Sequence, residues 1–259
     1  MRDLLAGRTL FAGDPLAVGL NGPINRADPD TNGEVFGKCP VGRQILPPSP
    51  WPLPAARDDI GTPRDAKAPA MQDIEIALEP LSPEAFAPYG EVISTAGPPS
   101  FQRPLLDNWR LPFATDAAAR LQIMRYHQQP MCLSRLERHI FVTEARFPIG
   151  GAAGVLVVGD DTDPSLPGAK PAPETLRAFL ITGAGVMLHP GTWHGLDCFP
   201  VGSATADFLF LSDAATEDEI ETQAAPMNGT RTHVADYDVS PGVRFVVTDP
   251  AGLMKRHPS

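Results

Sequence analysis

The sequence predicts an all-β, mainly antiparallel fold in the form of a sandwich or a barrel. From residue 74 onward, short apolar or alternating runs such as GVLVVGDD at residues 154–161 follow one another. Gly, Pro and Asp separate these runs, as they separate strands in antiparallel sheets. Only residues 216–225, TEDEIETQAA, have the composition of a longer helix. This spacing favours a β-sandwich or barrel over an alternation of strands with long helices.

The individual elements can be placed in order along the chain. Residues 74–81, IEIALEPL, alternate apolar and polar side chains, which predicts the first strand. Ser82 is a suitable helix N-cap and Pro83 a suitable first helical residue, so a short helix ending near Gly90 is expected. Acidic residues in the first turn of residues 216–225 favour a second helix. Further strands are expected in the runs that begin at Tyr89, Leu121, Phe141, Gly154, Leu176, Gly185, Ala206 and Val243.

The first part of the chain differs in composition from the rest. Residues 45–70 are rich in Pro and Ala and follow neither helical nor strand periodicity. Each Pro removes a backbone donor that a sheet would need. A flexible tail and an arm docked on the domain or on a partner subunit both fit this composition. We therefore expect a Pro-rich N-terminal extension at residues 1–73, a β-domain at 74–250 and a C-terminal tail at 251–259.

Composition and charge exclude several classes of function. A chain of 259 residues can bury a substantial core. Its formal net charge of −10 gives no attraction to nucleic acid or to an anionic membrane surface. No run approaches the roughly 20 apolar residues of a membrane span. Cys39, Cys132 and Cys198 are few and far apart, which favours free thiols in a reducing compartment. We expect a cytoplasmic protein.

Two stretches carry the side chains that bind metals. Residues 136–148, LERHIFVTEARFP, contain one histidine and two acids, and residues 185–196, GVMLHPGTWHGL, contain two histidines. A single histidine in a β-protein is more commonly structural than a ligand, so the prediction depends on the set. Carboxylate oxygens and imidazole nitrogens together suit a divalent first-row metal. The predicted metal ligands are Glu137, His139, Glu144 and His194.

Strand geometry explains why these residues can meet. Glu137 and His139 are two positions apart, so they face the same side of an extended chain, and Arg138 faces the other side. Glu144 follows after enough residues for a bend, and His194 comes from a turn that contains Pro190 and Gly191. If the two stretches lie on neighbouring strands of a barrel, the four side chains converge on its interior.

The order of these residues resembles a known pattern. E-x-H-x4-E followed by P-G-x-x-H is similar to the two metal motifs of cupins, H-x-H-x3-4-E and P-x-G-x2-H. Here Glu137 stands at the position of the first ligand, and Gly191 directly follows Pro190. Longer blocks, in the same order, resemble the ureidoglycolate lyase family across residues 74–215. These blocks are LEPLSPEAFAPYGEVI from Leu78, LERH from Leu136, VVGDD from Val157, TLRAFLITG from Thr175, GVMLHPGTWH from Gly185 and DFLFLSD from Asp207.

The resemblance implies a fold, an activity and a cofactor. The fold would be a cupin-type double-stranded β-helix barrel with a few short helices. The activity would be metal-assisted cleavage of ureidoglycolate, a small carboxylate from purine and allantoin breakdown, to glyoxylate and urea. The family suggests nickel, and manganese, zinc or iron would also suit the ligands. Where the family commonly has Gln and Phe, this chain has Glu144 and Arg146, and Gly195 replaces the second His of Trp-His-His-Pro.

The reaction of the family also implies roles for individual residues. Glu144 or His189 would act as the general base. Arg125 or Arg138 would bind the substrate carboxylate through paired hydrogen bonds. For Arg138, a surface ion pair is an equal alternative, because alternation turns it away from the two nearest ligands. Trp193 would form a wall of the site.

Two alternatives to a lyase remain open at this point. One is another cupin enzyme, an isomerase or a dioxygenase that acts on a small organic acid. The other is a module that binds small molecules without catalysis. In each case a homodimer is expected, because pairing between subunits covers exposed strand edges.

Overall fold

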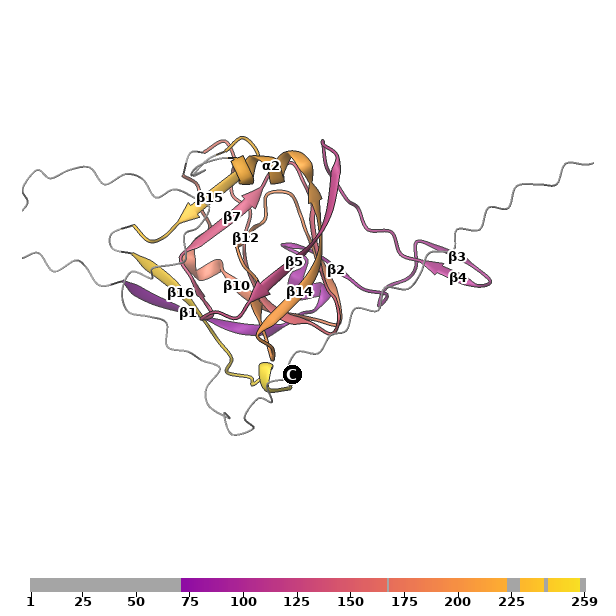
Figure 1. The fold of residues 1–259 in the computed structure, drawn as a ribbon, viewed down its shortest axis with the longest axis horizontal. Helices are drawn as coiled ribbons and strands as arrows, with labels where there is room; N and C mark the ends of the chain where they lie inside the picture. The colour runs from indigo at the N-terminus through magenta and orange to yellow at the C-terminus, as the bar shows by residue number, and fades with distance from the viewer. Residues whose placement is uncertain (1–70, 167, 223–228, 240–241, 257–259) are drawn as a thin grey trace, which may run out of the picture. The chain divides into compact units, whose positions relative to one another are not determined.

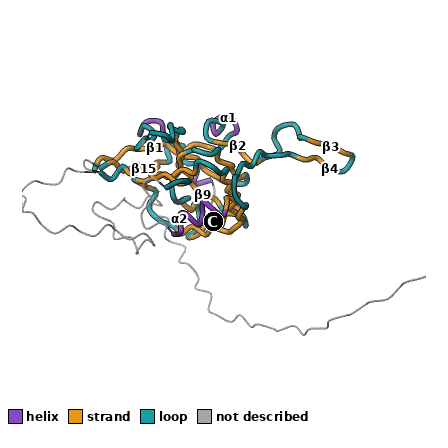
Figure 2. Tube along the Cα trace, turned by 90° about the horizontal axis from the view of Figure 1, so that it is seen from above, coloured by secondary structure: helices purple, strands orange, loops and turns teal. Residues whose placement is uncertain are grey.

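The computed structural model describes residues 71–166, 168–222, 229–239 and 242–256. The predicted extension at residues 1–73 therefore lies almost entirely outside the described residues, and the proposed division into three parts stays a prediction. Strands make up most of the regular secondary structure in the described chain (Figure 2). The first of them, β1, begins at Gln72, two residues before the start expected from its alternation.

The larger of the two main sheets has nine described strands. β1 runs parallel to β10 and to β16, and the other described pairings are antiparallel. The order is β15 (Thr232–Asp236), β7 (Arg135–His139), β12 (Trp193–Gly195), β9 (Ala153–Gly159), β10 (Arg177–Thr182), β1 (Gln72–Pro80), β16 (Val243–Thr248) and β6 (Cys132–Leu133), with β13 (Phe199–Pro200) paired to β9.

The second main sheet has five described strands, all antiparallel. Its order is β2 (Gly90–Ile93), β11 (Gly185–Leu188), β8 (Glu144–Pro148), β14 (Thr205–Asp213) and β5 (Ala119–His127). A hairpin of β3 (Phe101–Arg103) and β4 (Leu106–Asn108) extends away from the main sheets (Figure 1). The main sheets curl around a common interior (Figure 1), so the predicted cupin-type, mainly antiparallel barrel is confirmed.

Both predicted helices are present, at slightly different bounds. In α1 (Pro83–Phe86), the Ser82 hydroxyl oxygen accepts a hydrogen bond from the Ala85 amide at 3.2 Å, as its N-cap position predicts. α2 (Ala214–Thr222) begins two residues before the prediction. Its first turn is stabilised by Asp213, whose carboxylate accepts from the Thr216 amide at 2.7 Å. The expected end of this helix, residues 223–225, lies outside the described residues. Two short 3-10 turns complete the helices, η1 (Pro173–Thr175) and η2 (Met254–Arg256).

The central strands of the larger sheet are buried on both faces, which gives two apolar cores. Every residue of β9 is buried. Leu156 and Val158 point into the barrel, where they join Phe179 and Phe208. The alternate residues of β9 point to the opposite face and join a core with Leu136, Trp193 and Phe245. Side chains on both faces of the central strands are therefore shielded from solvent.

Two expectations from composition can be compared with the structure. Cys132 is disulfide-bonded, so the prediction of a free thiol is wrong at this position. Cys198 is free and buried, and burial raises the pKa of its thiol to about 12. Among the helices in the described residues, none has the length and apolar character needed to cross a membrane. Cytoplasmic localisation stays a prediction.

Gly90 sets the close approach of β2 to β11. A Cβ atom at this position would overlap the carbonyl oxygen of Met187 on the paired strand. We expect Gly90→Ala to lower the free energy of unfolding by about 1 to 3 kcal/mol, because the backbone must shift to relieve the overlap. Gly97→Ala is the matched control, since a Cβ there meets no atom within 4 Å. Urea denaturation of both variants measures the difference, and equal stability would contradict this account.

Candidate metal centre

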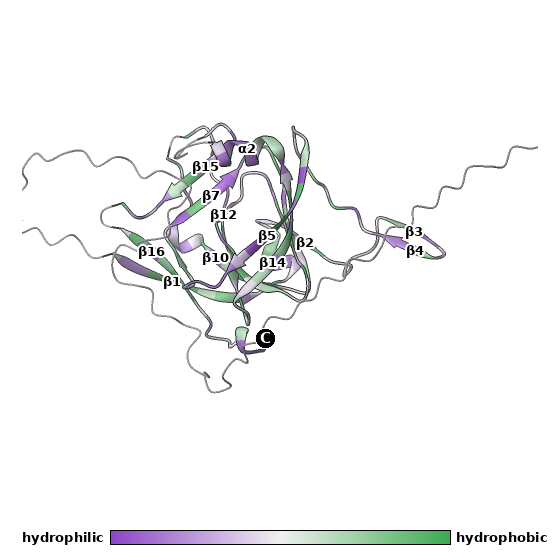
Figure 3. Cartoon of the chain, viewed as in Figure 1, coloured by the Kyte–Doolittle hydropathy of each residue, from purple (hydrophilic) through white to green (hydrophobic). Residues whose placement is uncertain are grey.

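Strand β7 carries polar side chains into the buried centre of the protein. Its sequence, Arg-Leu-Glu-Arg-His, is mostly hydrophilic (Figure 3), yet Arg138 and His139 are buried and Glu137 is only partly exposed. On the neighbouring strand β12, His194 lies directly opposite Glu137 in the antiparallel register. Buried polar groups need partners, so these residues must bind one another or a ligand.

The structure brings together all four residues predicted as metal ligands. One ligand atom each from Glu137, His139 and His194 lies within 4.8 Å of the others. Glu144 reaches the same place from β8 of the opposite sheet. Its Oε1 lies 3.3 Å from Nε2 of His139, and its Oε2 lies 3.1 Å from Nε2 of His194. The Glu144 carboxylate therefore bridges the two imidazoles. Of the four side chains, that of Glu137 is the most accessible, at 15% exposed.

The second nitrogen of each imidazole has its own partner. His139 Nδ1 lies 3.0 Å from the Thr232 hydroxyl, and His194 Nδ1 lies 3.0 Å from the carbonyl oxygen of Gly195. With a proton on Nδ1, each ring donates to that oxygen and keeps the Nε2 lone pair for the cluster, as metal-binding histidines do. Nε2 of His194 is buried without a hydrogen bond of good geometry in the described chain. This donor set fits a divalent metal.

Burial and the neighbouring charges shift the pKa values of three residues of the cluster. Burial alone would raise the pKa of Glu144, but the two imidazoles and Arg146 outweigh burial and hold this pKa below its ordinary value. Burial lowers the pKa of His139, although the carboxylates of Glu144 and Glu137 act in the opposite direction. Burial raises the pKa of Glu137, although His139 acts in the opposite direction. An ionised carboxylate beside neutral imidazoles is the form that coordinates a cation.

The Pro190-Gly191 turn brings His194 back to β7. Gly191 has a φ of +89°, a conformation that favours glycine. Its amide donates to the carbonyl oxygen of His139 at 2.8 Å, which ties the turn to the strand that carries two of the ligands. A Cβ at Gly191 would also press against the Asp161 carboxylate.

Arg138 and Trp193 lie on the other face of the sheet. The Arg138 guanidinium stacks 4.6 Å from the centroid of the Trp193 ring, and its Nη1 donates to the Asp161 carboxylate at 3.0 Å. Arg138 is only 1% exposed, so the alternative of a surface ion pair is wrong. As alternation predicts, it points away from Glu137 and His139. Neither Arg138 nor Trp193 is brought to the cluster.

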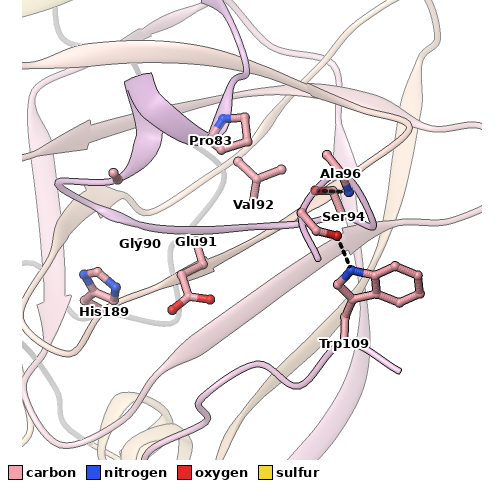
Figure 4. Close-up of a pocket in the computed structure, with 10 residues that line it drawn as sticks. Pro83, Gly90, Glu91, Val92, Ser94, Ala96, Trp109 and His189 are labelled. Carbon is pink, nitrogen blue, oxygen red and sulfur yellow. Dashed lines mark hydrogen bonds between the residues drawn. The ribbon is translucent and has the colours of Figure 1, made fainter. Parts of the chain in front are cut away.

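Two other predicted site residues are also not brought to the cluster. Arg125 is exposed on β5 and forms a paired ion bridge with Asp207, at 2.7 and 2.8 Å. His189 is exposed and lines a separate surface pocket with Glu91 and Trp109 (Figure 4). No residue of the metal cluster lines that pocket.

Three residues near the cluster were not assigned a site role from the sequence. Thr232 is the partner of His139 described above. Arg146 lies two positions after Glu144 on β8, and its Nη2 donates to Glu144 Oε2 at 3.3 Å. Glu217 of α2 is 8% exposed, and burial and the Glu144 charge raise its pKa. The alternation that pairs Glu137 with His139 would also have placed Arg146 beside Glu144. No comparable pattern in the sequence predicts that Glu217 lies near the cluster.

Comparison with known proteins assigns the family. The family model of ureidoglycolate lyase matches residues 73–230, more than half of the chain. The chain belongs to the ureidoglycolate lyase family. It is 33% identical to the ureidoglycolate lyase of Brucella anthropi over 161 residues, which cover 56% of this chain and 87% of that one. It is 34% identical to the Rhodobacter capsulatus ureidoglycolate lyase over 139 residues, 49% of this chain and 80% of the other.

A solved structure gives a weaker likeness. RmlC from Streptococcus suis, in complex with dTDP-D-xylose, aligns with 38% of this chain and 44% of its own, at 8% identity and a TM-score of 0.28. That overlap is partial, and the fold described above rests on the strands of this chain.

Thr232 offers a test of the metal centre that does not require catalysis. Thr232→Val keeps the shape of the side chain and removes the hydroxyl that orients His139. We expect its affinity for zinc to fall about 10- to 100-fold, as is usual when the partner of a ligating histidine is lost. Thr232→Ser, which keeps the hydroxyl, should bind zinc like the wild type. Competition with a chelating dye measures both, and equal affinity of the Val variant would contradict a metal centre with His139 as ligand.

Proposed function

We propose that this protein is a metal-assisted lyase that cleaves ureidoglycolate to glyoxylate and urea in the breakdown of allantoin. The observation that carries the proposal is the buried meeting of Glu137, His139 and His194 with Glu144 in a member of this family. Glyoxylate and urea are the products that the resemblance implied.

Three residues would hold the cation. A divalent metal bound by Glu137, His139 and His194 would act as a Lewis acid on the hydroxyl and carboxylate oxygens of the substrate. One carboxylate and two imidazoles accept several first-row metals, so nickel, manganese, zinc and iron are all candidates. Reconstitution with each metal in turn distinguishes them.

The substrate is a hemiaminal, and its cleavage needs one proton removed and one supplied. The hydroxyl loses its proton, the carbon–oxygen bond becomes a carbonyl, and the electrons of the carbon–nitrogen bond pass to the leaving urea nitrogen. Glu144 is ionised and reaches the cluster from the opposite sheet, so we assign it the removal of the hydroxyl proton. The same carboxyl group then supplies that proton to the nitrogen. The balance is complete without another reactant.

A dioxygenase acting on a small organic acid is the second candidate. Two histidines and one carboxylate with open positions are also the ligands of non-haem iron(II) oxygenases. Oxygen consumption by the iron-loaded protein, with a screen of small acids, would favour this candidate. A protein that binds such acids without turnover would instead be a binding module.

The residues that we assign can be separated by three variants. We expect His139→Ala to lose metal, because one of three ligands is absent. Glu144→Gln should keep the metal and lose about 100- to 10,000-fold in turnover, the usual contribution of a general base. His189→Ala should keep turnover, because this side chain is exposed away from the cluster. Metal content and the release of urea and glyoxylate measure all three. Full activity of Glu144→Gln would remove Glu144 as the base.

We also propose that two copies of the chain pair along β5. This strand is the last in its sheet, so one of its edges is free within the described residues. Part of its outer face is apolar, next to the Arg125–Asp207 ion pair: Leu121 is 63% exposed and Ile123 is 64% exposed, and Leu209 lies opposite Ile123 on β14. An apolar face beside a free edge suits association with a second copy.

Light scattering tests the homodimer. We expect the wild type to have twice the mass of the chain and Ile123→Lys to shift toward the monomer, because the charge would be buried in the interface. Leu105→Lys is the control. This residue is 98% exposed between β3 and β4, so its replacement should leave the mass unchanged. A monomeric wild type would contradict the proposal.

A further inference from the structure

Several buried polar atoms inside the barrel have no role in the scheme above. Within the described chain, Nε and Nη1 of Arg146 are buried and make no hydrogen bond, and Nε2 of Gln122 and Oγ of Ser212 are buried without one of good geometry, although both lie beside the carboxyl group of Glu217. Such atoms are nearly always paired in folded proteins. A group of unpaired polar atoms in one place therefore indicates a site for a polar ligand.

The strand register places these three residues on one face. Phe210 of β14 lies opposite Gln122 on one side and opposite Arg146 on the other. Ser212 is two positions further along β14, so its side chain points to the same side as Phe210. Glu144 is likewise two positions from Arg146. The unpaired atoms therefore share the barrel interior with the metal cluster.

Arg146 is the charged member of this group. It is 3% exposed, and its guanidinium lies 5.4 Å from the centroid of the Phe210 ring. Among the described residues, only Nη2 of this guanidinium has hydrogen-bond partners, Glu144 Oε2 at 3.3 Å and His194 Nδ1 at 3.2 Å. A buried guanidinium with two unpaired nitrogens is a strong donor to a carboxylate.

The formal charges of the site favour an anion. Glu137, Glu144 and Arg146 together carry a charge of minus one when the imidazoles are neutral and when the buried Glu217, whose pKa is raised by burial and by Glu144, is protonated. A divalent cation on the cluster changes this total to plus one. One carboxylate of a bound molecule then brings the buried site to neutrality, which a low-dielectric interior favours.

We propose that Arg146 is the subsite that binds the carboxylate of the substrate. The proposal rests on the proposed function and names the residue that selects an acid. It replaces the predicted role of Arg125 and Arg138, which the fold places elsewhere.

The state of His194 links this subsite to the cluster. When Nδ1 of His194 carries the proton and donates to Gly195, it cannot also accept a hydrogen bond from Arg146. That is the state in which Nε2 is free to act as a ligand. Nη2 of Arg146 then needs another acceptor beside Glu144, and a substrate carboxylate supplies it.

The test compares an acid with its neutral analogue. Glycolate has the hydroxyl and carboxylate of the substrate, and glycolamide has the same shape without the charge. Calorimetry with the zinc-loaded, full-length protein measures both. We expect the wild type to bind glycolate at least 10-fold more tightly than glycolamide. Arg146→Met should lower the affinity for glycolate about 10- to 100-fold and leave the affinity for glycolamide nearly unchanged. The affinity of Arg146→Lys for glycolate should lie between those of the wild type and of Arg146→Met.

Arg135→Met is the matched control. This arginine is exposed on β7 in an ion pair with Asp236, so its loss should not affect glycolate. A zinc-loaded, folded Arg146→Met protein that binds glycolate like the wild type would overturn the proposal. If Arg146→Met fails to fold or to bind zinc, the same criterion is applied to Arg146→Lys: wild-type affinity for glycolate in that variant would overturn the proposal. A wild type without preference for glycolate over glycolamide also overturns it.

The proposed subsite and the proposed lyase reaction can be tested independently. If the wild type releases no urea and Arg146→Met loses glycolate binding, the subsite stands and the proposed reaction is wrong. If the wild type and Arg146→Met release urea with the same KM, the reaction stands and the subsite is wrong. Under the proposal, the variant raises KM for ureidoglycolate more than it lowers kcat.

Discussion

The pairing of β7 with β12 is the constraint on which the rest of the site depends. It places His194 opposite Glu137, and alternation then places His139 on the same inner face. The same register turns Arg138 and Trp193 to the other face, where they stack on each other. Because side chains alternate with a period of two, a slip of one residue in β12 would exchange His194 for Trp193 inside the barrel. The turn at Gly191, tied to the His139 carbonyl, fixes the register at the end where the ligands lie.

The opposite sheet contributes charge to this arrangement. Glu144 and Arg146 are the two positions of β8 at which the chain departs from the common family pattern of Gln and Phe, and in the structure they form one ion pair. A carboxylate alone at this depth would be destabilising, and so would a guanidinium alone, since breaking a buried pair costs about 3 to 5 kcal/mol. The ion pair therefore balances charge in the interior and adds hydrogen-bond donors next to the predicted metal ligands.

Local pattern predicted the parts of the site that depend on neighbouring residues in the sequence. Alternation placed Glu137 and His139 on one face and Arg138 on the other, and the N-cap at Ser82 located α1. Local pattern did not predict the features that depend on contacts between segments far apart in the sequence. His194 was expected in a turn, yet it belongs to the short strand β12, which is held between β7 and β9. β15 was not expected, although its Thr232 orients His139. Arg138 is buried because its partners, Asp161 and His233, come from 23 and 95 residues away.

Burial on both faces of β7 explains how a largely hydrophilic strand can hold a site in position. On the outer side, Arg138 bonds to Asp161 and Thr162, and Asp161 in turn lies against the Gly191 turn that leads into β12. On the inner side, the Glu144 carboxylate reaches both imidazoles. Arg138, His139 and His194 are thus each held by contacts from at least one other element, which favours a site that is in place before a cation or a substrate binds. In the proposed reaction, this preorganisation would let a weak base such as the Glu144 carboxylate remove a proton at a defined position, because the geometry need not be assembled during the reaction.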